Sequence, residues 1–77
     1  MEIKVLFFGV IAEVTKTMFR HYRDVSSFSD LKHRLEDEFP EIVHYDFRIA
    51  VNSELINDEP VLKNNDEVAL MPPFAGG

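Results

Sequence analysis

The sequence predicts an α+β fold in which one main amphipathic helix packs on one face of a mixed β-sheet. Short segments with alternating apolar residues occur near both ends of the chain, and one segment in the middle has apolar residues at helical spacing. The chain has 77 residues, which allows one domain, and hydrophobic residues make up 45% of it, which is enough for one core. Packing the helix against the sheet buries all these apolar stripes together.

The first expected strand covers residues 2–8 and ends at Gly9. Every second residue in it, from Ile3 through Val5 to Phe7, is apolar and falls on one face, as in a half-buried strand. The strand therefore directs these three side chains toward the helix.

The next two segments are less clear. Residues 10–14 are apolar enough to pack but too short to assign to a helix or a strand. Residues 17–22 are rich in β-branched and aromatic side chains and are expected to form the second strand. Met18 and Tyr22 compete with Phe19 for its buried face, so the inward face of this strand stays open.

The helix expected over residues 27–39 is the clearest element. Its apolar residues form one stripe at helical spacing, made of Phe28, Leu31, Leu35 and Phe39. Ser27 and Asp30 resemble a capping box at its start. Pro40 disfavours helical geometry at the residue before it, so the helix should stop near residue 39. The acidic residues 36–38 are expected to form a solvated face.

The rest of the chain predicts further strands joined by turns. Residues 47–51 alternate again, with Phe47, Ile49 and Val51 inward, and a turn at 52–54 leads to a short return strand at 55–56. A second turn at 63–66 precedes the last strand, 67–71, in which Val68 and Leu70 share one face. This set of strands completes the expected sheet.

The composition argues against several classes of function. The formal net charge of −6 opposes nucleic-acid binding, which needs a basic face. The absence of cysteine excludes disulfides, thiol catalysis and a Cys-based zinc site. The histidines, His21, His33 and His44, lack metal-ligand spacing, and Gly9 alone makes no phosphate-binding loop. We expect no bound cofactor or metal and no membrane span, and a cytoplasmic location is the default expectation.

The chain ends in Pro72-Pro73-Phe74-Ala75-Gly76-Gly77. We expect residues 1–71 to form the folded domain and residues 72–77 to form a flexible tail. The prolines cannot continue a β-ladder and stiffen the exit from the sheet, whereas glycine without a Cβ can enter a narrow channel. Six extended residues reach about 20 Å, so the tail is suited to place its end inside a partner's active site.

Carboxylate chemistry explains what that end could do. The carboxylate of Gly77 becomes electrophilic after adenylation by ATP, and a sulfur donor can then displace AMP to leave a thiocarboxylate. A sulfur atom carried on the main chain requires no cysteine. Gly77 is thus the candidate reactive residue, with Gly76 beside it.

Large apolar residues are also expected on the outward face of the sheet. Leu6 and Phe8 on the first strand and Met71 on the last point away from the helix side, and Leu55 is placed to join them. If contiguous, they form a partner surface; scattered surface hydrophobes are the alternative interpretation.

Three stretches of sequence carry a family resemblance: residues 5–9, Val51-Asn52 and, above all, residues 65–77, from Asn-Asp-Glu-Val to Pro-Pro-Phe-Ala-Gly-Gly. They resemble the small, sulfur-carrying subunit of molybdopterin synthase in the MoaD/ThiS ubiquitin-like superfamily. The family often has Gly where this chain has Asn65, which also accepts left-handed geometry. It often has an Arg in the segment after the first strand, and residues 10–14 contain none.

The resemblance implies a β-grasp, ubiquitin-like fold and a series of partners. An E1-like adenylyltransferase would use ATP to activate Gly77, and a sulfurtransferase would supply the sulfur. The carrier would then join the large subunit of molybdopterin synthase in a heterotetramer and donate sulfur to cyclic pyranopterin monophosphate, in molybdenum cofactor biosynthesis. The implied contacts with partners are made by Phe8, Leu55, Met71, Pro72, Pro73, Phe74 and Ala75.

Three alternatives remain open at this point. The chain could be a protein modifier joined to lysines, a sulfur carrier for thiazole or cysteine synthesis, or a ubiquitin-like adaptor with an inert tail. All of them share the predicted fold, so only the fate of Gly77 and the choice of partner separate them.

Overall fold

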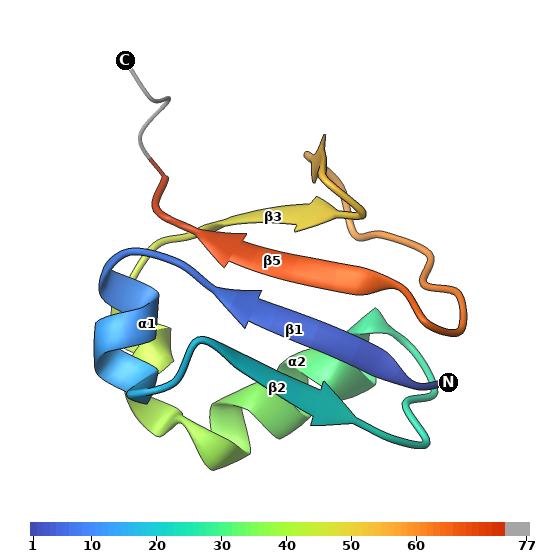
Figure 1. Ribbon diagram of the computed structural model, residues 1–77, viewed down its shortest axis with the longest axis horizontal. Helices are drawn as coiled ribbons and strands as arrows, with labels where there is room; N and C mark the ends of the chain where they lie inside the picture. The colour runs from blue at the N-terminus through green and yellow to red at the C-terminus, as the bar shows by residue number, and fades with distance from the viewer. Residues whose placement is uncertain (74–77) are drawn as a thin grey trace.

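The computed structural model describes residues 1–73 of the chain. Its elements are, in chain order, β1 (Ile3–Phe7), α1 (Val10–Thr15), β2 (Phe19–Tyr22), α2 (Phe28–Glu38), the 3-10 helix η1 (Pro40–His44), β3 (Arg48–Val51), β4 (Glu54–Ile56) and β5 (Glu67–Met71). The strands form one mixed sheet, and α2 packs on one face of it (Figure 1). The predicted α+β class is confirmed.

The strand order is β2-β1-β5-β3-β4, with the two terminal strands of the chain adjacent at the centre. β1 and β5 pair in parallel, whereas the other three pairs are antiparallel. Because parallel strands end at the same edge of a sheet, the chain leaves β1 and β5 at neighbouring points. The tail therefore starts beside the connection from β1 to α1.

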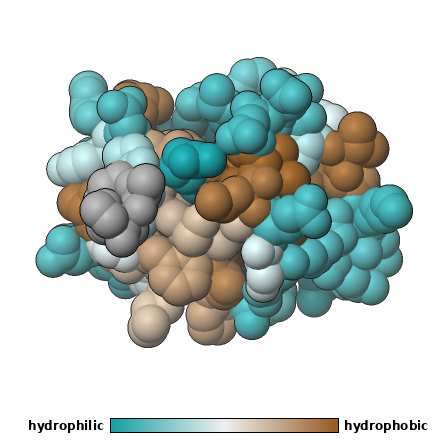
Figure 2. Space-filling view, turned by 90° about the horizontal axis from the view of Figure 1, so that it is seen from above, coloured by the Kyte–Doolittle hydropathy of each residue, from teal (hydrophilic) through white to brown (hydrophobic). Residues whose placement is uncertain are grey.

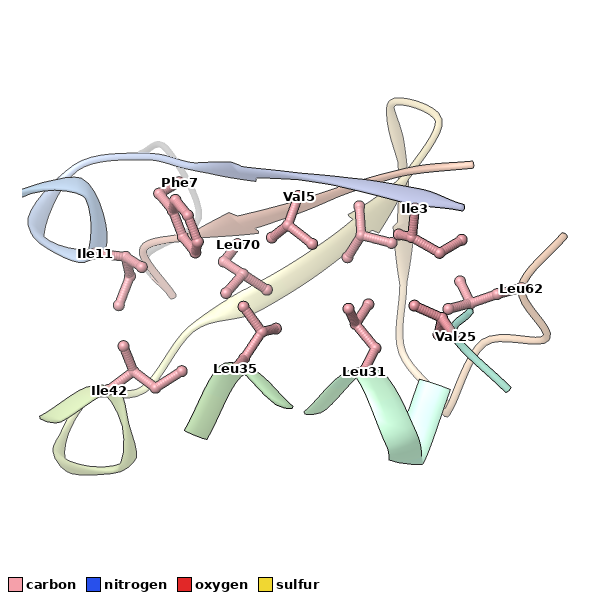
Figure 3. Packing of buried hydrophobic residues seen from close by; sticks show 11 residues of the cluster. Ile3, Val5, Phe7, Ile11, Val25, Leu31, Leu35, Ile42, Leu62 and Leu70 are labelled. Atoms are coloured by element: carbon pink, nitrogen blue, oxygen red, sulfur yellow. The ribbon is translucent and has the colours of Figure 1, made fainter. Parts of the chain in front are cut away.

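The core lies between the sheet and the helices (Figure 3). Side chains of Ile3, Val5, Phe7 and Leu70 come from the sheet and face those of Ile11, Leu31, Leu35 and Ile42 from the helices. The ring of Phe7 meets that of Phe39 edge-on, with 5.4 Å between centroids. All the inward residues predicted for β1, α2 and β5 are thus in or against the core, as predicted.

The structure settles the two segments that the sequence left open. Residues 10–15 form α1, which buries Ile11 and Thr15. In β2, Tyr22 pairs with Ile3 and Arg20 pairs with Val5, so these two residues of β2 share the inward face. Phe19 points outward.

Three local details differ from the expectations. The helix η1 was not predicted, and β2 begins at Phe19. Ser27 does cap α2 by accepting a hydrogen bond from the Asp30 amide at 3.1 Å, but the Asp30 carboxylate accepts from the amide of Ser26. In a full capping box the Asp30 carboxylate would accept from the amide of Ser27, the cap residue itself. Here it accepts from the amide one residue earlier in the chain.

Candidate functional site

The outward face of the sheet carries one row of apolar residues that crosses all five strands. Cross-strand register places these residues side by side in the order Phe19, Leu6, Ala69, Ala50, Leu55. We call this set the outer row. Its residues come from positions 6 to 69 of the chain, so the sheet topology alone brings them together.

The outer row has large side chains at its two ends and small side chains toward its middle. Phe19 is 48% exposed and Leu55 is 52% exposed, whereas the two central residues are alanines. Ala50 is only 4% exposed, so neighbouring side chains largely cover this part of the outer row. Seen from the side of β3 and β4, hydrophobic residues gather in the middle of the molecule and extend to the lower edge of the view, with hydrophilic residues above them and to the right (Figure 2).

Two more apolar residues extend the outer row toward the edge where the tail begins. Met71, the last residue of β5, pairs with Arg48 of β3 and is partly buried. Phe8 follows β1 and is 45% exposed, and its amide donates to the carbonyl of Leu70 at 3.0 Å. The predicted residues Phe8, Leu55 and Met71 thus lie on one face together with the outer row. The face is continuous up to the point where β5 ends.

Cations border this apolar face on both sides. The ammonium of Lys4 lies 5.2 Å from the centroid of the Phe19 ring. On the other side, the guanidinium of Arg48 donates to Oδ1 of Asn57 at 3.1 Å. A polar rim around an apolar centre is typical of protein interfaces.

The tail begins at this same edge. Pro72 is partly buried and Pro73 is exposed. Phe74, Ala75, Gly76 and Gly77 lie outside the described residues, as does most of the predicted flexible tail. The structure therefore positions the base of the tail next to the apolar face.

A cluster of ionisable side chains joins β2 to α2. Oε1 of Glu38 accepts from the Tyr22 hydroxyl at 2.5 Å, and its Oε2 accepts from Nε of Arg20 at 2.7 Å. Burial and the hydrogen bond to Glu38 raise the pKa of Tyr22 well above its ordinary value. Partial burial acts to raise the pKa of Glu38, but the hydrogen bonds from Tyr22 and Arg20 outweigh it and hold that pKa below its ordinary value. These contacts attach the edge strand to the helix, and we assign them no chemical step.

Residues 1–73 contain no cluster of three His, Cys, Asp or Glu side chains that could hold a metal ion. In the same range, no helix has the length and apolar character needed to cross a bilayer. The features of the described chain that relate to a partner are the apolar face and the base of the tail.

Sequence reasoning did not assign three residues to the partner surface: Phe19, Ala50 and Ala69, although it placed Ala69 on the outward side of its strand. The two alanines carried a usable signal, because Ala50 and Ala69 alternate with residues that were predicted to point inward. No comparable signal in the sequence marked Phe19, since the inward face of its strand was undecided.

Comparison with known proteins places the chain in context. The model of the ThiS family matches residues 5–77. The small archaeal modifier protein 1 from Methanosarcina acetivorans is 24% identical, with 99% of this chain and 96% of that chain covered and a TM-score of 0.80. A putative molybdopterin converting factor subunit 1 from Pyrococcus furiosus is 20% identical, with coverage of 96% and 99% and a TM-score of 0.81.

A third solved structure is a complex of subunits 1 and 2 of the molybdopterin-converting factor from Helicobacter pylori. The matched chain is 28% identical, both chains are covered completely and the TM-score is 0.74. These likenesses confirm the β-grasp, ubiquitin-like fold.

Proposed function

The chain belongs to the ThiS family, and from that membership we propose that it is a sulfur carrier whose reactive group is the C-terminal carboxylate of Gly77. The observation that carries this proposal is the apolar face of the sheet, which runs across five strands to the edge where the tail begins. A partner that covers this face receives the tail beside it. Such an arrangement suits a carrier whose end is processed by other proteins.

The proposed chemistry proceeds in two steps on the main chain. A carboxylate oxygen of Gly77 attacks the α-phosphorus of ATP and releases pyrophosphate, which leaves an acyl adenylate. Hydrosulfide then attacks the carbonyl carbon, AMP leaves, and loss of the sulfur-bound proton gives a thiocarboxylate. An E1-like adenylyltransferase and a sulfurtransferase supply the catalytic groups, and this chain supplies the carbonyl.

The pathway that we propose is molybdopterin synthesis, with the thiocarboxylate donating sulfur to cyclic pyranopterin monophosphate on a large subunit. Support comes from the Helicobacter pylori complex, in which a chain 28% identical to this one over its full length is joined to its subunit 2. We propose that the face containing Phe8, Leu55 and Met71 is the surface that binds the large subunit. A heterotetramer with the large subunit dimer is the assembly that we expect.

Intact mass spectrometry tests the carrier chemistry directly. Incubation with an E1-like enzyme, ATP and sulfide is expected to add about 16 Da, the difference between sulfur and oxygen, at Gly77. Deletion of Gly77, or addition of one alanine after it, is expected to abolish the gain without changing the far-ultraviolet circular dichroism spectrum. If a variant with a blocked terminus gained the same mass, the proposed function would be wrong.

Two further readouts separate the pathways. Conversion of cyclic pyranopterin monophosphate by the charged carrier with the large subunit supports molybdopterin synthesis. An isopeptide bond between Gly77 and lysines of other proteins, with no sulfur in the product, would instead identify a modifier. Both outcomes use an activated C-terminus, so the first mass measurement alone does not distinguish them.

A further inference from the structure

Gly9 occupies the junction between β1 and α1 and lies against the base of the tail. Its backbone has φ 55° and ψ −133°, a conformation that residues with a side chain rarely adopt. A Cβ atom built on Gly9 would lie 2.6 Å from Cγ and 3.4 Å from Cδ of Pro72. The ring of Pro72 therefore occupies the space that a side chain at position 9 would need.

Hydrogen bonds on both sides hold this junction in place. The Phe8 amide donates to the Leu70 carbonyl at 3.0 Å, and the Gly9 carbonyl accepts from the amides of Ala12 and Glu13 at 3.1 and 3.3 Å. The helix that supplies these two amides is anchored in turn, because Ile11 is fully buried. These contacts therefore hold the backbone of Gly9 in a defined position.

Pro72 has fewer means of holding its position. It follows the last residue of β5 and, as a proline, has no N–H to donate to a strand. Its ring fixes its own φ near −65°, and a second proline follows. Whatever sets the position of the Pro72 ring also sets the direction of the chain at Pro73.

We propose that Gly9 is a positioning residue, whose missing side chain provides the seat for the Pro72 ring and so fixes the direction in which the chain leaves the sheet. The consequence for sulfur loading rests on the function proposed above, because only then does the direction of the tail affect a reaction. Misplacing a reacting group by about 1 Å can cost a hundredfold in rate. The Gly9–Pro72 contact is therefore expected to act on the rate of charging at Gly77 and not on docking.

The first test needs no enzyme. In Gly9→Ala, residual dipolar couplings of the Cα–Hα bonds of Pro72 and Pro73 should change relative to the sheet, while those of β1 and β5 stay the same. Pro72→Ala keeps Gly9 and removes the ring from its seat, so it should reorient Pro73 even if Gly9→Ala fails to fold. The matched control is Val25→Ala, which removes buried methyl groups beside Met1, at the opposite end of β1. Unchanged orientation of Pro73 in the variants that fold would overturn the proposal.

The second test measures charging by the E1-like enzyme that adds sulfur to the unchanged chain. Gly9→Ala and Pro72→Ala should each lower kcat by about tenfold or more. In Gly9→Ala, which replaces none of the expected partner contacts, KM should stay nearly constant. The double variant should be no slower than the slower single variant, because both changes remove the same contact. Additive losses, or an equal loss in Val25→Ala, would overturn the positioning role. If the unchanged chain is not charged at all, the proposed function fails, whereas the dipolar couplings still decide the role of Gly9.

Discussion

At the scale of single residues, the Asp66 carboxylate connects two turns to the start of β5. Its Oδ1 accepts from the Asn52 side chain at 2.9 Å, and its Oδ2 accepts from the Lys63 amide at 2.7 Å. Asn52 in turn accepts from the Glu67 amide at 3.0 Å. The hydrogen bonds from Asn52 and then from Lys63 hold the pKa of Asp66 below its ordinary value.

This shift predicts a loss of stability in acid. Because the pKa is lower in the folded chain, the contribution of Asp66 is present above its unfolded value of about 3.9 and is lost as pH falls through the folded value. We expect the urea midpoint to fall less steeply with pH in this range in Asp66→Asn than in the unchanged chain. Asp58→Asn removes the same charge from an exposed side chain and controls for net charge. Identical slopes in Asp66→Asn and the unchanged chain would contradict the assignment.

Individual residues differ in how far the sequence could predict them. Ile3, Val5 and Phe7 were predicted to be buried, because strand alternation is a local signal. Asn65 was expected to tolerate left-handed geometry and has φ 69°. The contact between Tyr22 and Glu38 spans 16 positions of the chain and depends on how β2 lies against α2, so no local pattern indicates it.

At the scale of elements, α2 begins at a cap that the sequence did indicate. Oγ of Ser27 accepts from the Asp30 amide at 3.1 Å and so satisfies one of the amides left unpaired at the start of a helix. Ser27→Ala is expected to lower the free energy of unfolding by about 1 kcal/mol. The urea midpoint should fall while the m-value stays constant. Ser29→Ala, at an exposed position inside the helix, is the control and should not destabilise the protein.

The two short helices show why some elements could not be predicted. Six residues are too few to form a stable helix alone, so α1 depends on burying Ile11 and Thr15 and on the Thr15 hydroxyl, which donates to the Ile11 carbonyl at 2.9 Å. The helix η1 follows Pro40 and exists where Ile42 reaches the core. Tertiary contacts decide both elements, whereas the stripe of α2 is strong enough to be read locally.

At the scale of the whole molecule, the candidate site is a product of the strand order. Strand alternation predicted that Leu6, Phe8 and Met71 point outward. Leu55 was expected to join them because it follows the turn, and cross-strand register places it in the same row as Leu6. That they form one face follows from the order β2-β1-β5-β3-β4, which also brings Phe19 to its far end. The reactive terminus that we propose was indicated by the order of residues in the tail, where Pro72-Pro73 precede the terminal Gly76-Gly77.

The central prediction at this scale is that the apolar face is the docking surface for the large subunit. Leu55→Asp places a charge at the end of the outer row, on β4 at the sheet edge, where the side chain is 52% exposed and the fold does not depend on it. Binding to the large subunit, measured by calorimetry, should weaken by about tenfold or more if Leu55 is one of the few residues that dominate the interface. Val61→Asp adds the same charge at a side chain that is 89% exposed in the connection between β4 and β5, and it should bind normally. Equal weakening in both variants would mean that added negative charge, and not loss of the apolar face, opposes docking. An unaffected Leu55→Asp would place the docking surface elsewhere on the molecule.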